Sequence, residues 1–162
     1  NLLERKFFCF VQFIVASLRR FSAAFCVDAL TCVATATGMA AVFAALASQL
    51  KTGDRVVASR ALFGSCLYII AEQLPKFGIE TVLVDGADLE QWKQALSKKT
   101  QCVFLETPSN PCLEIIDIRA VCDLAHEAGA RVIVDNVFAT PVLQHPLELG
   151  ADIVMRMQMR IY

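Results

Sequence analysis

The sequence predicts an α/β fold, a three-layer αβα sandwich around a mainly parallel sheet. Short segments rich in valine and other apolar residues alternate with helical patterns, and these segments cover residues 55–59, 80–84, 102–105, 131–134 and 152–155. Apolar runs of this length are typical of parallel strands buried on both faces, and the alternation is typical of βαβ units. The length of 162 residues suits one domain.

The regular pattern begins at about Thr31. Residues 37–50 are rich in alanine and leucine and have no helix breaker after Gly38, which predicts a buried helix. A Lys-Thr-Gly-Asp turn ends this helix, and residues 55–59 form the first strand of the alternating pattern. A loop around Phe63 leads to a helix over residues 65–74, stopped by Pro75.

The same alternation continues toward the carboxyl end. Asp88 is a plausible N-cap for a helix over residues 89–97, because its carboxylate can accept from the first free amides. After the strand at 102–105 comes a loop rich in proline and asparagine, residues 106–111. Asp117 then caps a helix that runs to about Ala128, with Gly129 as its stop.

The composition excludes several classes of partner. Hydrophobic residues make up 56% of the chain and the mean hydropathy is +0.53, but the apolar residues come in short runs that favour a sheet covered on both faces over a membrane segment. The net charge is −1, and no basic run is interleaved with aromatic residues. We therefore expect neither a nucleic-acid partner nor a membrane partner.

The cysteines and histidines indicate a reducing compartment and no metal site. The seven cysteines are odd in number, include no Cys-x-x-Cys pair and mostly lie within apolar runs, so they predict buried thiols in a cytoplasmic protein. His126 and His145 lie far apart, without partners at ligand spacing.

The first 30 residues do not follow the alternating pattern. A basic pair precedes the apolar run at residues 7–18, as in a signal peptide, but the run is shorter than the roughly 20 residues of a membrane span. We expect residues 1–30 to be an amphipathic or disordered leader. An exported or membrane-attached α/β protein is the alternative interpretation.

In a parallel sheet the ligand crevice lies outside the carboxyl ends of the strands. Asp135 directly follows an apolar strand, so its carboxylate can hold a cation there, either a magnesium ion or a protonated pyridine nitrogen. Such an aspartate is also common in α/β folds without this function. Gly38 and Met39 open a helix whose free amides can bind a phosphate.

Two loops at the same edge add to this set. The prolines on either side of Asn110 stiffen its loop and can hold the side-chain amide in place, although the segment is also ordinary turn sequence. Phe63 can stack on a flat ligand or fill the core. Together these residues match pyridoxal 5′-phosphate. They offer a binding site for its phosphate, an aromatic ring to stack on its ring, an amide to bond its hydroxyl and an aspartate to pair with its ring nitrogen.

From about Thr31 to Met155 the chain resembles the Cys/Met-metabolism (transsulfuration) family of fold-type I pyridoxal-phosphate enzymes. The segments that carry the resemblance are ATATGMAA, GDRVVAS, FGSC, ETPSNP, IIDI, VIVDNVFATP and LELGADIV, in family order. The resemblance implies a partial large domain over residues 31–155, between the leader and an aberrant tail at 156–162.

The resemblance also implies a role for each candidate residue. Gly38 and Met39 would give backbone N–H groups to the phosphate, Asn110 would bond the ring hydroxyl, and Asp135 would pair with the pyridinium nitrogen. Phe63 stands at the ring-stacking position, where the family usually has a tyrosine that several lyases use in proton transfer.

The DNVFATP segment together with Phe63 is most similar to the O-succinylhomoserine sulfhydrylase branch. That branch implies γ-replacement on O-succinylhomoserine or O-acetylhomoserine with sulfide, giving homocysteine, with a small amino-acid substrate and a homo-oligomeric assembly. Cystathionine γ-synthase and cystathionine γ-lyase of the same family are the alternatives.

The chain departs from the family after Met155. The family continues with His-Ser-x-Thr-Lys, whereas this chain has Arg160 at the position of the Schiff-base lysine and methionines where the serine and threonine assist phosphate binding. An arginine cannot replace the imine-forming amine. We expect no catalytic residue in this chain, no activity of the chain alone and weak cofactor binding. Frameshifts at both ends would account for this pattern. A non-catalytic remnant or a pseudogene product is the alternative.

Overall fold

The computed structural model describes residues 8–12 and 31–157. Their strands form one seven-stranded sheet in the order β2-β1-β7-β6-β5-β3-β4, and every neighbouring pair is parallel. The strands are β1 (Phe8–Gln12), β2 (Thr31–Thr35), β3 (Arg55–Ser59), β4 (Glu80–Val84), β5 (Cys102–Glu106), β6 (Arg131–Asp135) and β7 (Ile153–Met157).

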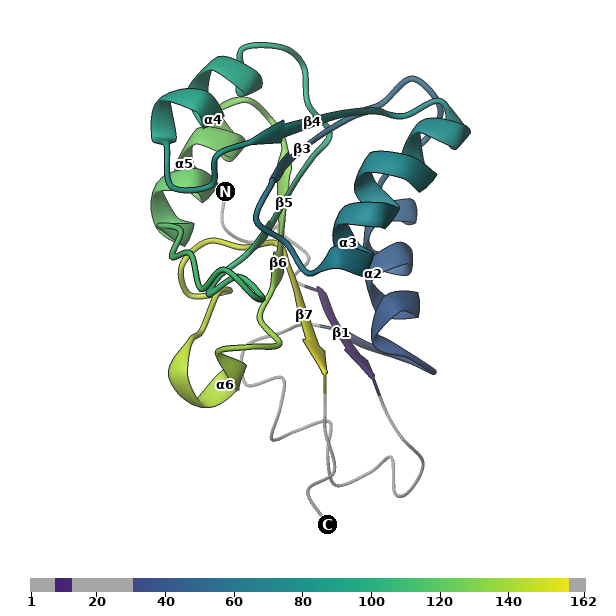
Figure 1. Cartoon of the computed structure of the whole chain (residues 1–162), viewed down its shortest axis with the longest axis vertical. Helices are drawn as coiled ribbons and strands as arrows, with labels where there is room; N and C mark the ends of the chain where they lie inside the picture. The colour runs from purple at the N-terminus through teal and green to yellow at the C-terminus, as the bar shows by residue number, and fades with distance from the viewer. Residues whose placement is uncertain (1–7, 13–30, 158–162) are drawn as a thin grey trace.

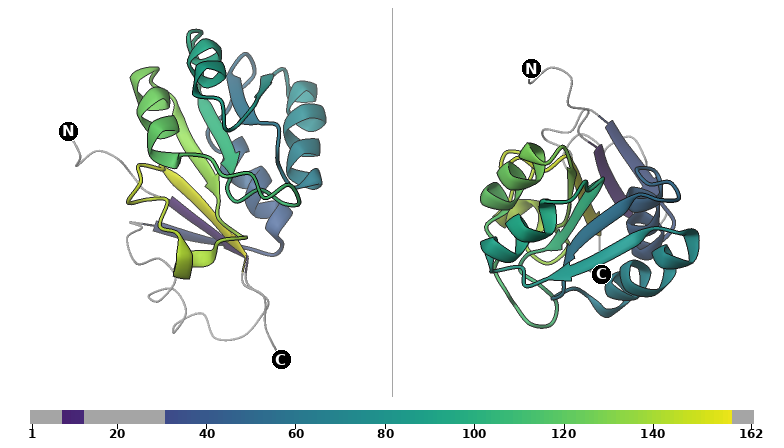
Figure 2. Two further views of the ribbon diagram at one scale, coloured as in Figure 1. Left: turned by 60° about the vertical axis from the view of Figure 1, so that its left-hand side comes forward. Right: turned by 90° about the horizontal axis from the view of Figure 1, so that it is seen from above.

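Helices cover both faces of this sheet, as Figures 1 and 2 show. On one face lie α2 (Gly38–Ala47), α3 (Gly64–Tyr68), the π-helical turn η2 (Ile69–Gln73) and the 3₁₀ turn η3 (Leu74–Phe77). On the other face lie α4 (Leu89–Leu96) and α5 (Ile118–Glu127). The short helix α6 (Thr140–Leu143) follows β6. The predicted three-layer αβα sandwich is confirmed.

The central strands contribute side chains to two separate hydrophobic cores, because successive side chains of a strand point to opposite faces of the sheet. Phe104 of β5 and Ile133 of β6 pack against α2, α3 and η2, whereas Val103 and Val132 pack against α4 and α5. All five residues of β3 and of β5 are buried. This double burial explains why the predicted strands lack a polar face.

The predicted helix caps are present. The side chain of Asp88 accepts from the amides of Glu90 and Gln91, and that of Asp117 accepts from the amide of Ala120. Gly129 follows α5 with a φ of 76°, a left-handed conformation that glycine adopts at little steric cost.

The helix expected to stop at Pro75 runs further as η3. Pro75 lies in the first turn of this 3₁₀ segment, where its missing N–H is not needed, and Gly78 ends the segment with a φ of 73°. Three further elements, β1, β2 and α6, were not predicted. The apolar and aromatic residues of β1 belong to the run at residues 7–18, but they suit a strand equally well.

Most of the expected leader lies outside the described residues, as does the tail from residue 158, including Arg160. The described part of the leader is β1, which pairs with β2 on one side and with β7 on the other. None of the helices within 31–157 is long and apolar enough to cross a membrane.

Candidate functional site

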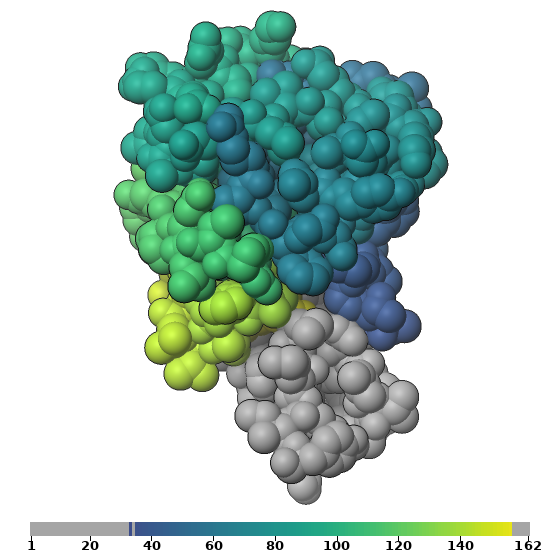
Figure 3. Space-filling model, viewed as in Figure 1, coloured from purple at the N-terminus to yellow at the C-terminus, as the bar shows by residue number. Residues whose placement is uncertain are grey.

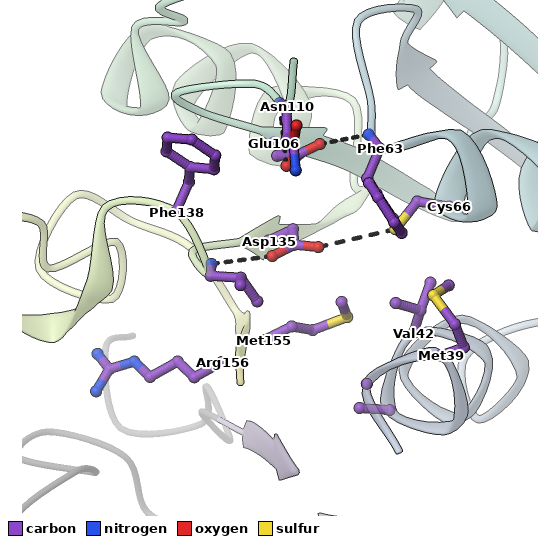
Figure 4. A pocket seen from close by; sticks show the side chains of 13 residues that line it. Met39, Val42, Phe63, Cys66, Glu106, Asn110, Asp135, Phe138, Met155 and Arg156 are labelled. Carbon is purple, nitrogen blue, oxygen red and sulfur yellow. Dashed lines mark hydrogen bonds between the residues drawn. The ribbon is translucent and has the colours of Figure 1, made fainter. Parts of the chain in front are cut away.

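A cavity of about 180 Å³ opens at the carboxyl ends of β5, β6 and β7, beside the start of α2 and of α3 (Figure 4). Its walls come from both the sheet and the helices of one face. The lining residues are Gly38, Met39, Ala41, Val42, Phe63, Cys66, Glu106, Asn110, Asp135, Val137, Phe138, Met155 and Arg156.

All five residues that the sequence predicts for the site line this one cavity. Gly38 and Met39 begin α2, Phe63 precedes α3, Asn110 belongs to the loop after β5, and Asp135 ends β6. The topology thus brings four segments that are distant in sequence to one place. The part that each residue plays in binding remains a prediction.

Asp135 is held at the floor of the cavity with both carboxylate oxygens bonded. Its Oδ1 accepts from the amide of Val137 at 3.0 Å, and its Oδ2 accepts from the Cys66 thiol at 3.8 Å. Only 5% of the residue is exposed. Burial raises the pKa of Asp135 to about 6, and the two hydrogen bonds oppose this rise.

Glu106 is a second buried carboxyl in the cavity, and it was not predicted as a site residue. Its Oε2 accepts from the amide of Phe63 at 2.6 Å, and its Oε1 accepts from the amide of Asn110 at 3.2 Å. Burial raises the pKa of Glu106 to about 7, and the neighbouring Asp135 adds to the rise. Its place directly after an apolar strand, like that of Asp135, was the available signal.

The amino end of α2 supplies N–H donors to the cavity. Thr37 is the N-cap, and its Oγ1 accepts from the amide of Ala40 at 3.1 Å. The amides of Gly38 and Met39 precede the first complete turn, so they have no acceptor within the helix. These amides and the positive end of the helix dipole suit an anion.

The loops after β5 and β6 are tied together beside the cavity, and they adjoin on the surface in Figure 3. Gln144 donates from Nε2 to the carbonyl of Thr107 at 2.7 Å and to Oδ1 of Asn136 at 2.8 Å. Asn136 in turn donates from Nδ2 to the carbonyls of Gln144, at 3.0 Å, and of Thr140, at 3.2 Å. This network fixes the segment between Asp135 and α6. Two residues of that segment, Val137 and Phe138, line the cavity.

Cys66 and Arg156 also line the cavity. Burial, together with the nearby carboxylates Asp135 and Glu106, raises the pKa of the Cys66 thiol, so this group stays a neutral donor. Arg156 is the first residue of the expected aberrant tail, and it lies in β7 as a buried residue.

The cavity therefore combines backbone N–H donors, an exposed aromatic ring at Phe63, a side-chain amide and two carboxyl groups. The N–H donors suit a phosphate, and a carboxylate suits a protonated ring nitrogen. This set fits a flat, cationic ring that carries a phosphate group.

Comparisons with known proteins agree with this chemistry. Residues 22–159 match the family model described as Cys/Met metabolism PLP-dependent enzyme. The chain is 59% identical over 122 residues to an O-succinylhomoserine sulfhydrylase of Mycobacterium tuberculosis, covering 75% of this chain and 30% of that protein. It is 48% identical over 124 residues to an L-methionine gamma-lyase of Fusobacterium nucleatum, covering 76% and 31%.

A solved structure of cystathionine gamma synthase from Xanthomonas oryzae has the same fold over the matched part. The TM-score is 0.73 at 35% identity, and the match covers 75% of this chain and 32% of that one. This chain spans about 30% of the length of the curated relatives it matches.

Proposed function

Because the chain belongs to the Cys/Met metabolism family of pyridoxal-phosphate-dependent enzymes, we propose that the cavity described above is a binding site for pyridoxal 5′-phosphate. One observation carries the proposal. The five residues that the sequence predicts to bind this cofactor all lie in the wall of a single cavity. Asp135 would pair with the protonated ring nitrogen. Such a pair keeps the ring cationic, and bound pyridoxal phosphate then acts as an electron sink for carbanions formed on the substrate.

The other four residues would bind and orient the same molecule. The amides of Gly38 and Met39 would bond the phosphate, Phe63 would stack on the ring, and Asn110 would bond the ring hydroxyl. Phe63 is 43% exposed, so its ring is accessible to a ligand. The tied loops after β5 and β6 would limit the movement of Asn110 and Asp135 relative to each other.

We propose γ-replacement on O-succinylhomoserine or O-acetylhomoserine with sulfide, giving homocysteine, as the reaction of the whole protein. The similarity to an O-succinylhomoserine sulfhydrylase and the phenylalanine at position 63 support this choice within the family. The resemblance implies that Arg160 stands where the family has its cofactor-bonding lysine. This chain would therefore position the cofactor without supplying the base that moves the substrate proton.

Cystathionine γ-synthase is the second candidate, favoured by the likeness to a solved synthase. The two reactions differ in the thiol that adds to the γ-carbon, sulfide in one and cysteine in the other. Cystathionine γ-lyase is disfavoured by Phe63, because a phenyl ring cannot supply the phenolic proton. A non-catalytic remnant is the candidate that Arg160 favours.

The remaining proposals concern location and assembly. Cys66, Cys102 and Cys112 are free thiols, which supports a reducing compartment, and we propose the cytoplasm. A homo-oligomer is proposed from the family resemblance alone. Cell fractionation and the mass of the native protein in solution test these two proposals.

The binding proposal is tested with pyridoxine 5′-phosphate, which has the phosphate and the ring but no aldehyde, so it cannot react with surface lysines. We expect saturable binding that is weakened by Asp135→Ala and by Phe63→Ala, and much weaker binding of pyridoxine without the phosphate. An exposed aspartate changed in parallel, Asp123→Ala, is the control. Equal binding of both ligands would contradict the proposed phosphate site.

The reaction is tested by the release of succinate from O-succinylhomoserine in the presence of sulfide or of cysteine. We expect the chain alone to release none. Turnover by the chain alone would contradict the part of the proposal that rests on Arg160, and the product, homocysteine or cystathionine, would then identify the thiol.

A further inference from the structure

Glu106 connects two segments of the cavity wall through one buried carboxyl group. Its two oxygens accept from different parts of the chain, Oε2 from the amide of Phe63 at 2.6 Å and Oε1 from the amide of Asn110 at 3.2 Å. Phe63 leads into α3, whereas Asn110 lies in the loop after β5. Figure 4 shows Glu106 next to Asn110, with the hydrogen bond to Phe63 as a dashed line.

The geometry requires a group that accepts at both ends. A carboxylate has two acceptor oxygens and no donor, so it can satisfy both amides at once. A glutamine has one acceptor and one NH₂ group, which would bring two donors face to face at one of the two contacts. Glu106 is only 3% exposed, so water cannot replace the lost acceptor. The backbone amide at that contact would then be a buried donor without a hydrogen bond, which is costly.

Other titratable groups line the same cavity as Glu106, and Asp135 among them affects the pKa of its carboxyl. Asp135 lies opposite Glu106 in the register of β5 and β6, and Cys66 of α3 and Arg156 of β7 line the same cavity. Burial and the neighbouring Asp135 oppose the ionised form of Glu106 and raise its pKa to about 7, whereas the two amides favour the ionised form. The two hydrogen bonds therefore offset part of the effect of burial and of Asp135.

We propose that Glu106 is a positioning residue that sets the separation between Phe63 and Asn110, and thereby the width of the slot for the cofactor ring. The inference rests on the proposed function, because it assigns these two residues to the ring. Glu106 itself need not touch the cofactor. Its effect on binding is transmitted through the two amides.

The test combines Glu106→Gln with Phe63→Ala in a double-mutant cycle, read out by the affinity for pyridoxine 5′-phosphate. We expect Glu106→Gln to weaken binding about tenfold, the size of effect that follows from losing one charged hydrogen bond. We expect Phe63→Ala to have a smaller effect in the Glu106→Gln background than alone, because the ring is then already displaced. Glu127→Gln, on the exposed side of α5, is the matched control.

Two results would overturn the inference while leaving the proposed function intact. One is wild-type affinity in Glu106→Gln, and the other is strict additivity of the two changes. A wild-type chain that does not bind pyridoxine 5′-phosphate would instead remove the proposed function, and this inference with it.

A second measurement decides the matter if Glu106→Gln does not fold. In the wild-type protein, the amide resonances of Phe63 and Asn110 are followed by NMR as the pH changes. Two amides bonded to one carboxyl must move together, with one shared midpoint. Separate midpoints, or no movement of either resonance, would overturn the inference.

Discussion

Glu106 and Asp135 lie directly opposite each other at the ends of the neighbouring strands β5 and β6. Both side chains turn into the same cavity, and both are almost completely buried. Burial raises the pKa of each carboxyl, to about 7 for Glu106 and about 6 for Asp135. A cation beside these two carboxyls, such as a protonated ring nitrogen, would favour the ionised form of both.

The raised pKa of Asp135 makes the stability of the protein, measured without added ligand, depend on pH. The folded state keeps this proton up to about pH 6, whereas the unfolded chain releases it near the ordinary pKa of 3.8. Stability from this group is therefore greatest below pH 4, and it falls as the pH rises through 6. The shift is about two pH units, so the loss is at most about 3 kcal/mol.

Asp135→Asn should remove this dependence, because the amide stays neutral at every pH. We expect the free energy of unfolding of the variant, measured by urea denaturation, to fall less between pH 4 and pH 8 than that of the wild type. The control Asp123→Asn, on the exposed side of α5, should follow the wild type at both values. A variant whose stability falls as steeply as that of the wild type contradicts the assignment.

Ligand affinity should change with pH in the opposite direction. The ionised form of Asp135 is the one that pairs with a pyridinium nitrogen, and its share rises about tenfold between pH 5 and pH 7 for a pKa of about 6. We expect the affinity for pyridoxine 5′-phosphate to rise by a similar factor. The phosphate of the ligand also titrates in this range, so the quantity to compare is the difference between the wild type and Asp135→Asn.

Much of the fold was predictable because its strands are buried on both faces and its helices carry clear caps. The apolar run at residues 132–134 indicates a buried strand, and all three residues are buried. Asp117 and Gly129 mark the ends of α5. The strand β2 was missed because alanine and threonine dilute its apolar pattern. The four-residue helix α6 is too short to show a helical period.

The site was predictable in part for a different reason. Gly38, Phe63, Asn110 and Asp135 each follow or precede a predicted element at the same edge of the sheet, so the topology alone brings them together. Glu106 was not predicted, because a glutamate at a strand end ordinarily faces solvent. Only the structure reveals that two distant amides bind its carboxyl.

The thiols should differ sharply in reactivity. Cys66 is buried, and its raised pKa keeps it protonated, whereas Cys112 is exposed. Since the thiolate is the reactive form, iodoacetamide at pH 8 should label Cys112 well before Cys66 in the folded protein. Peptide mapping by mass spectrometry measures both rates, and urea should remove the difference. Rapid labelling of Cys66 in the folded protein would contradict the position of its thiol beside Asp135.

Phe63 offers the most direct test of ring stacking. The side chain is 43% exposed, so Phe63→Ala removes little buried surface and should leave the midpoint of urea unfolding almost unchanged. The same change should weaken the binding of pyridoxine 5′-phosphate by about 1 kcal/mol, or roughly fivefold, because stacked aromatic pairs contribute about this much. Phe63→Tyr keeps the ring and should bind as the wild type does.

Phe77 provides the matched control, because it is 54% exposed and lies outside the cavity lining. Phe77→Ala should leave the affinity unchanged. If Phe63→Ala and Phe77→Ala bind equally well, the ring at position 63 does not stack on the ligand.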